Sequence, residues 1–183
     1  MSKKKFISEV LKSTGTIGAL SPSSSFLAKK MLEPIDFNQA KCLVEFGPGT
    51  GVFTKKILKK MNSNAILLTF EINPTFIKEL QNIKDDRLVI INDSAEKIEE
   101  YLQKHNRSSA DYIISSLPFA MIPDEVVHTI LTNSDNALSE TGKYIQFQYS
   151  LNAKKKLESY FSEVEINFTV LNLPPAFIYV CKK

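Results

Sequence analysis

From residue 41 onward, short apolar runs alternate with segments whose apolar residues recur at helical spacing. The apolar runs predict five strands, at residues 41–46, 66–70, 88–91, 111–115 and 143–149. The helical spacing predicts helices at residues 52–61, 74–80, 94–104 and 123–131, and a lysine-rich helix near Lys154. Strands that alternate with helices pair in parallel through right-handed crossovers, so the pattern predicts an α/β, doubly wound sheet.

The chain finishes with two further β-rich segments, at residues 163–171 and 177–181. No helical segment separates them, so they are expected to pair antiparallel at the end of the sheet. The intervening Pro174-Pro175 pair cannot continue a ladder of backbone hydrogen bonds, and it therefore marks a turn or a bulge.

The first forty residues have a different character and are treated as an N-terminal helical segment, 1–40, in front of the main domain, 41–183. Residues 3–13 place Phe6, Ile7, Val10 and Leu11 on one side and lysines on the other, as in an amphipathic helix. Ser21-Pro22 is typical of a helix start, and predicts a second helix with Phe26, Leu27 and Met31 facing inward. The two helices either cover the sheet or serve a binding role.

Composition excludes several classes of protein. With 183 residues, 43% of them hydrophobic and 23% charged, the chain suits one globular domain. Apolar runs such as 65–68 are far shorter than the roughly 20 residues of a membrane span, and no secretory signal is visible. Two distant cysteines, Cys42 and Cys181, suit a reduced compartment, so we expect a cytoplasmic protein with both thiols in its core.

Charge is distributed unevenly along the chain. Residues 1–60 hold eleven Lys and four acidic residues, whereas the remainder holds 12 basic and 16 acidic residues. The basic part either faces the phosphates of nucleic acid or lipid, or forms a solvated lysine-rich face. Only Arg87 and Arg107 are arginines, which argues against sequence-specific recognition of nucleic acid.

A glycine-rich loop, Gly47-Pro48-Gly49-Thr50-Gly51, joins the first strand to the first helix of the main domain. Glycines let the backbone approach a ligand closely, and the N–H groups at a helix start favour a negative group. The spacing is G-x-G-x-G, with Val52 where a dinucleotide-binding fingerprint has its third glycine, and no Gly-Lys-Ser/Thr follows. The spacing of the glycines therefore argues against NAD and ATP as ligands of this loop.

Polar or rigid residues follow the next three strands as well. Glu71 can accept hydrogen bonds from both hydroxyls of a ribose, or cap the helix near Pro74. Asp93 can accept from the amino group of an adenine, or act as a helix cap with Ser94. Pro118 and Phe119 form an apolar wall where open α/β sheets bind ligands. Together, the glycine loop and these three segments indicate a nucleoside-containing ligand at the carboxyl edge of the sheet.

These motifs resemble those of class I S-adenosylmethionine-dependent methyltransferases. The resemblance rests on residues 45–51, Glu71, Asp93 and residues 116–119, and it covers the main domain. It implies a Rossmann-like, seven-stranded sheet, mostly parallel with an antiparallel last strand. It also implies S-adenosyl-L-methionine as the cofactor.

Three segments are more specifically similar to bacterial phospholipid N-methyltransferases, which are related to the ribosomal RNA adenine dimethyltransferases. They are residues 15–24, 116–120 and 173–179. The RNA enzymes carry Asn-Leu-Pro-Tyr where this chain has Ser116-Leu117-Pro118-Phe119, and a serine cannot offer the asparagine carbonyl to an adenine amino group. They also add a helical RNA-binding domain, whereas this sequence stops at Lys183. Both departures argue against RNA methylation.

The resemblance assigns roles to particular residues. Methyl transfer to an amine is an in-line displacement, so the protein has to hold the acceptor nitrogen in line and exclude water. The residues expected around the cofactor are Ser24, Ser25, Glu45, Gly47, Gly49, Gly51, Glu71, Ile72, Asp93 and Ser94. Of these, Glu45 is expected to position the glycine loop and Ile72 to meet the adenine face. The acceptor amine is expected at Ser115, Ser116 and Phe119, with Tyr149 as a candidate base.

Other titratable residues are not expected to take part. His105 lies at a solvated helix end and His128 inside a helix, and the cysteines and histidines have no metal-ligand spacing. Three hypotheses remain. The first is an enzyme that methylates the amine of a phospholipid such as phosphatidylethanolamine, peripheral on the inner membrane surface. The second is a methyltransferase of RNA or of a soluble small molecule, and the third is a binding module without turnover.

Overall fold

The fold is known from a computed structural model, which describes residues 25–183. The predicted amphipathic helix at residues 3–13, the helix start at Ser21-Pro22 and the candidate cofactor residue Ser24 lie outside this range. The described residues form seven strands. In chain order they are β1 (Cys42–Phe46), β2 (Ile66–Phe70), β3 (Leu88–Ile91), β4 (Ala110–Ser115), β5 (Leu138–Gln148), β6 (Glu163–Thr169) and β7 (Ala176–Lys182). They form one sheet in the order β3-β2-β1-β4-β5-β7-β6.

The sheet is parallel from β3 to β5, and β7 is antiparallel to both of its neighbours. The predicted class is confirmed: a doubly wound, Rossmann-like α/β sheet with an antiparallel end. The α-helices are α2 (Ser25–Leu32), α3 (Val52–Lys60), α4 (Pro74–Leu80), α5 (Ile98–Lys104), α6 (Asp124–Ala137) and α7 (Lys154–Glu158). The described part of the chain also has three 3₁₀ turns: η1 (Ala95–Lys97), η2 (Phe119–Met121) and η3 (Leu151–Ala153).

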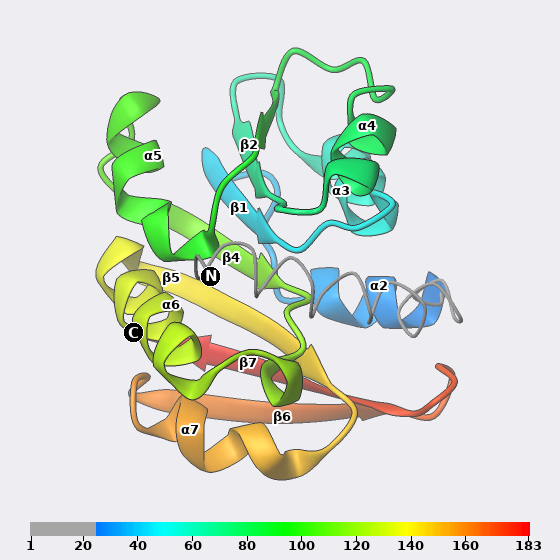
Figure 1. The fold of residues 1–183 in the computed structure, drawn as a ribbon, viewed down its shortest axis with the longest axis vertical. Coiled ribbons are helices and arrows are strands. Elements are labelled where there is room, and N and C mark those ends of the chain that lie inside the picture. Colours follow the sequence, from blue (N-terminus) through cyan, green and yellow to red (C-terminus); the bar gives the residue numbers. More distant parts are fainter. Residues whose placement is uncertain (1–24) are drawn as a thin grey trace.

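Apolar side chains project from both faces of the central strands, and a separate layer of helices covers each face of the sheet. Val44, Leu68 and Ile113 belong to a core shared with α5, α6 and α7. The alternate residues of the same strands, such as Leu43 and Leu67, belong to a core shared with α2 and α3. Figure 1 shows α5, α6 and α7 along the left and lower side of the sheet and α2, α3 and α4 to its right. Burial on both faces explains why the central strands are continuous apolar runs.

Helix α2 differs from the prediction at one of its three inward positions. Leu27 and Met31 are buried in the same core as Leu43, as predicted. Phe26 is 55% exposed, so the expectation that it faces inward was wrong. The buried stripe of α2 also includes Ala28 and Leu32, and Phe26 lies outside this stripe because each helical residue turns about 100° from the last.

Strand β5 and helix α6 are longer than their apolar patterns indicated. Helix α6 continues to Ala137, and β5 follows it directly at Leu138, five residues before the predicted start. This first part of β5 contains the exposed Glu140 and Thr141, so it lacks an apolar run. No helix in the part of the chain that the structure describes is long and apolar enough to cross a bilayer.

Candidate functional site

The glycine loop lies at the carboxyl end of β1 and opens α3. Gly49 has a φ of 55°, and a Cβ atom built on it would meet no atom of residues 25–183 within 4 Å. Gly51, at the N-cap of α3, has a φ of 79°, and a Cβ atom there would lie 3.0 Å from Ile83 and 3.1 Å from Leu80. Gly51 therefore lets the loop pack on the residues after β2, whereas Gly49 leaves its outer side open for a ligand to approach.

Glu71, at the carboxyl end of β2, joins the loops that follow the first two strands. Its Oε2 accepts a hydrogen bond from the Gly49 N–H at 3.2 Å, and its Oε1 accepts from the Ile72 and Asn73 N–H groups at 2.9 Å each. A carboxylate offers about four lone-pair positions, so these bonds leave one position for a hydroxyl instead of the two that the sequence suggested. Burial raises the pKa of Glu71, and the three N–H donors oppose that rise.

Asp93 and Ser94, after β3, form a second polar cluster on the same edge of the sheet. Ser94 is the N-cap of η1 and accepts a hydrogen bond from the Glu96 N–H. Asp93 is only 6% exposed, and its Oδ2 accepts from Lys97 Nζ at 2.9 Å and from the Tyr101 hydroxyl at 3.3 Å. Ser94 therefore has the capping role that was expected as an alternative, and the Asp93 carboxylate is held in a fixed orientation by Lys97 and Tyr101.

Glu45 lies within β1, two residues before Gly47 of the glycine loop, and is completely buried. Its Oε2 accepts a hydrogen bond from the Thr54 hydroxyl of α3 at 2.7 Å, while its Oε1 is buried without a hydrogen-bond partner among the described residues. The pKa of this carboxyl is raised to about 8, chiefly by burial and also by the nearby Glu71 charge, whereas the Thr54 hydrogen bond opposes the rise. An unpartnered carboxylate oxygen below the loop suits a cationic ligand group.

The segment after β4 forms the wall beside this edge. Ser115 is fully buried, and its Oγ accepts a long hydrogen bond of 3.4 Å from the Leu117 N–H, so Ser115 lies beneath the segment. Ser116 is half-buried, and its Oγ has no hydrogen-bond partner in the described range. Phe119 begins η2, is 7% exposed, and lines a pocket of about 310 Å³ together with Gln148 and Lys156.

Two glutamines of β5 hold this segment in place, and the sequence analysis did not identify them. Gln146 Nε2 and Gln148 Nε2 both donate to the Leu117 carbonyl, at 3.0 and 2.9 Å. Gln146 is itself fixed, because its Oε1 accepts from the Tyr144 hydroxyl at 2.9 Å. A signal was available: polar residues at alternate positions 144, 146 and 148 share one face of a strand that was expected to be buried.

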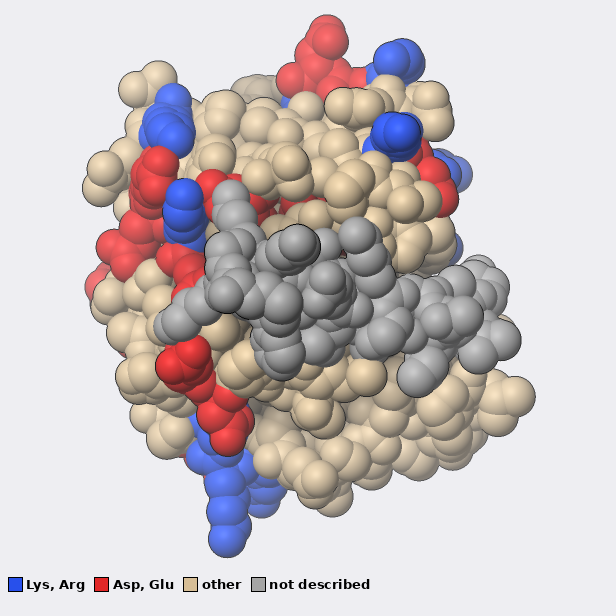
Figure 2. Space-filling view, in the orientation of Figure 1, with Lys and Arg blue, Asp and Glu red and all other residues tan. Residues whose placement is uncertain are grey.

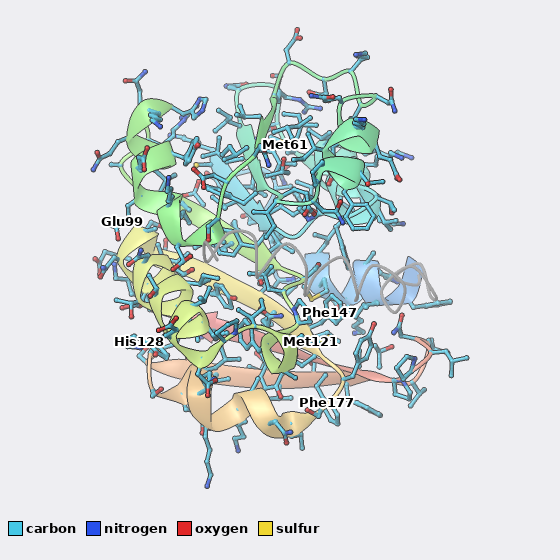
Figure 3. All side chains as sticks on the ribbon, viewed as in Figure 1. Met61, Glu99, Met121, His128, Phe147 and Phe177 are labelled. Carbon is cyan, nitrogen blue, oxygen red and sulfur yellow. The ribbon has the colours of Figure 1, made fainter. Side chains whose placement is uncertain are left out.

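Of Tyr149, His105 and His128, Tyr149 alone lies at this edge of the sheet. It follows β5 directly, is 49% exposed, and its ring packs edge-on against Phe147 at 5.6 Å between ring centroids. His128 lies on α6 and hydrogen-bonds to the Tyr160 hydroxyl. Figure 3 places Phe147 and Met121 on the right of the view, near the ends of β4 and β5, and His128 on the left. His105 is the C-cap of α5.

Ile72 and Ser25 are the remaining candidate cofactor residues, and the two cysteines lie elsewhere in the core. Ile72 is half-buried beside the core of Phe46 and Phe70. Ser25 begins α2. Cys42 and Cys181 are buried free thiols, as expected, and burial raises the pKa of each to about 12. Within residues 25–183, no group of His, Cys, Asp and Glu side chains is arranged to hold a metal ion.

The residues present fit a nucleoside joined to a charged amino acid portion. Gly49 leaves an open approach, Glu71 keeps one acceptor position, and Glu45 offers an unpartnered carboxylate oxygen. These three features lie at the carboxyl ends of two adjacent parallel strands, β1 and β2. This edge is where open α/β sheets bind their ligands.

Comparison with known proteins identifies the family. A family model described as a methyltransferase small domain matches residues 16–171. An ornithine lipid N-methyltransferase from Singulisphaera acidiphila is 26% identical over 180 residues, which cover 97% of this chain and 94% of that protein.

Solved structures share the fold. The precorrin-6y C5,15-methyltransferase of Geobacter metallireducens has a TM-score of 0.70 at 13% identity, covering 87% of this chain and 89% of that chain. A putative rRNA methylase of Clostridium thermocellum has a TM-score of 0.59 at 17% identity, covering 78% of this chain and 86% of that chain. The chain belongs to the methyltransferase small domain family, and it is a class I methyltransferase that uses S-adenosylmethionine.

Proposed function

We propose that this enzyme transfers the methyl group of S-adenosylmethionine to the primary amine in the head group of a membrane lipid. The observation that carries the proposal is the full-length likeness to an ornithine lipid N-methyltransferase, which extends over 97% of this chain. Phosphatidylethanolamine and ornithine lipid both present such an amine, so either lipid suits the proposal.

The surroundings of the acceptor segment favour a lipid over RNA. Residues 112–123, which end β4 and form the segment after it, contain no charged side chain. Neither do residues 144–153 of β5 and η3, nor residues 166–181 of β6 and β7. An RNA-binding surface needs several Lys and Arg to neutralise phosphates, whereas, among the described residues, Lys156 is the one basic residue that lines the Phe119 pocket. The rRNA methylase among the structural neighbours is similar in fold, at 17% identity.

In this proposal the chain binds and orients both reactants. Gly49 and Glu71 hold the nucleoside, and Glu45 accepts from the ammonium group of the methionine portion. The cofactor supplies a methyl group already activated on sulfur, so no nucleophilic side chain is needed. Phe119 excludes water, and Ser116 Oγ, which lacks a partner among the described residues, is placed to accept a hydrogen bond from the amine. This bond would direct the nitrogen lone pair towards the methyl carbon.

The test is to supply methyl-labelled S-adenosylmethionine together with vesicles that contain phosphatidylethanolamine or ornithine lipid, and in parallel with ribosomal RNA. We expect label in at least one lipid and none in the RNA. Label in RNA alone would instead support an enzyme that methylates RNA. Cofactor binding without labelling of any amine would reduce the chain to a binding module.

A positioning role for Gln148 gives a mutational prediction. Gln148→Leu removes one of the two donors to the Leu117 carbonyl and loosens the acceptor segment. A neutral hydrogen bond contributes about 1 kcal/mol, so kcat is expected to fall about fivefold. The Kd for S-adenosylmethionine, measured by calorimetry, should stay unchanged. Gln103→Leu on the exposed face of α5 is the matched control. A kcat equal to that of the wild type would contradict this role.

A further inference from the structure

Exposed apolar side chains gather at one end of the sheet. Eight large hydrophobic residues are exposed among those described, and six of them belong to the end of β5, η3 and the β6–β7 hairpin. We call these six the apolar rim: Tyr149, Leu151, Phe168, Val170, Leu171 and Leu173. Leu173 is 80% exposed and Val170 is 67% exposed. Exposing this much apolar surface is unfavourable in water, which indicates an interaction site.

Strand register brings the rim together. Gln148 of β5 is aligned with Phe177 of β7, which in turn is aligned with Phe168 of β6. The β6–β7 loop therefore extends beyond the sheet at the same end as Tyr149, on the right in Figure 1. Burial raises the pKa of Tyr149, and the side chain of Asn172 in that loop opposes this rise. The six residues thus all lie at the end of the sheet where β5 finishes and where β6 and β7 are joined.

The loop that carries the rim is held by its own polar groups. The Leu171 N–H donates to Thr169 Oγ1 at 3.3 Å, and Asn172 Nδ2 donates to the Pro174 carbonyl at 2.7 Å. Asn172 is 3% exposed, whereas Leu171 and Leu173 on either side of it point outward. A loop with internal hydrogen bonds enters an apolar medium at lower cost, because fewer of its polar groups lose water.

The charge pattern around the rim fits a lipid surface. Residues 166–181 contain no charged residue, and η3 is followed directly by Lys154, Lys155 and Lys156 at the start of α7. Figure 2 shows a blue lysine cluster at the lower edge of the molecule and a surface without charged residues to its right. Helix α2, which packs against β5, β6 and β7, adds Lys29 and Lys30. Apolar residues bordered by lysines suit the interface of a bilayer that contains anionic lipid.

We infer that the apolar rim is the surface by which the enzyme enters such a bilayer. The inference rests on the proposed function and deepens it. Gln148, which donates to the acceptor segment, is adjacent to Tyr149 of the rim. Insertion of the rim therefore brings the acceptor segment to the depth of the head groups. A lipid amine then reaches Ser116 while its acyl chains stay in the bilayer.

A tryptophan reporter tests the inference directly, because the chain contains no Trp. Leu173→Trp places the reporter in the rim, and Ser63→Trp places a control on the exposed loop between α3 and β2, at the opposite end of the sheet. Vesicles of phosphatidylcholine and phosphatidylglycerol should shift the emission at position 173 to the blue and leave that at position 63 unchanged. No shift at position 173, or equal shifts at both positions, would overturn the inference.

A double variant, Leu171→Ser with Leu173→Ser, measures the contribution of the rim. Its partition onto these vesicles should fall at least about tenfold, which corresponds to about 1.4 kcal/mol. Turnover of a short-chain, water-soluble amine lipid should stay at the wild-type level. Unchanged partition, with conversion of a dimer to a monomer in sedimentation, would show that the rim binds a second copy instead. A normal reporter shift without methylation of any lipid would leave the docking surface in place and refute the proposed function.

Discussion

Replacing Glu71 with alanine is expected to weaken the binding of S-adenosylmethionine by about 100-fold. The carboxylate keeps one lone-pair position for a ribose hydroxyl, and it orders the glycine loop through the Gly49 N–H. A hydrogen bond to a charged group contributes about 1.5–3 kcal/mol, and about 2.7 kcal/mol corresponds to two decades of Kd. Isothermal titration calorimetry with S-adenosylmethionine and with its demethylated product measures the change.

Two companion variants separate binding from folding. Glu71→Gln keeps an oxygen acceptor and loses the charge, so its Kd should lie between those of the wild type and the alanine variant. Glu79→Ala removes an exposed carboxylate from α4 and should bind normally. Thermal unfolding of each variant without ligand shows whether the fold persists. A well-folded Glu71→Ala protein with wild-type affinity would remove Glu71 from the site.

Glu45→Gln is expected to stabilise the enzyme at pH 8 while weakening its binding of the cofactor. Burial raises the pKa of Glu45 from 4.5 to about 8, so the folded state binds the proton more tightly than the unfolded state. The free energy of unfolding therefore falls as the pH rises from about 4.5 to about 8, and stays low above that range. The total decrease in the free energy of unfolding over this pH range is at most about 5 kcal/mol. The glutamine variant lacks this dependence.

Urea denaturation at several pH values tests this expectation. The variant should equal the wild type in stability at pH 4, where Glu45 is protonated in both states, and exceed it at pH 8. Thr54→Val is the companion variant, because it removes the hydroxyl that donates to Glu45 Oε2, raises the pKa of Glu45 further and should extend the loss of stability to higher pH. Parallel stability curves for the wild type and Glu45→Gln would show that Glu45 titrates normally.

The central strands could be predicted because burial on both faces makes them continuous apolar runs. The runs at 66–70 and 88–91 coincide with β2 and β3. The start of β5 could not be found in this way, since Glu140 and Thr141 are exposed at the sheet's end. The side chain of Phe26 was predicted on the wrong side of its helix. A few apolar residues do not define which side of a short helix meets the sheet.

The candidate site could be located from sequence, but its contacts could not. Each strand of a parallel sheet ends at the same edge, so Glu71 and the glycine loop were expected to meet. The hydrogen bond from Gly49 to Glu71 spans 22 residues, and it uses an acceptor position that had been assigned to a ribose. Gln146 and Gln148 were missed because their partner, Leu117, is 29 and 31 residues away. Long-range pairing of this kind depends on how the strands align.

Hydrogen–deuterium exchange with and without S-adenosylhomocysteine tests the position of the cofactor most directly. We expect ligand-dependent protection in peptides that cover residues 45–51, 71–73 and 92–95, at the carboxyl ends of β1, β2 and β3. Peptides that cover residues 61–65 and 105–109, at the opposite end of the sheet, should exchange at the same rate in both samples. Protection confined to the opposite end, or no protection anywhere at saturating ligand, would contradict the site described above.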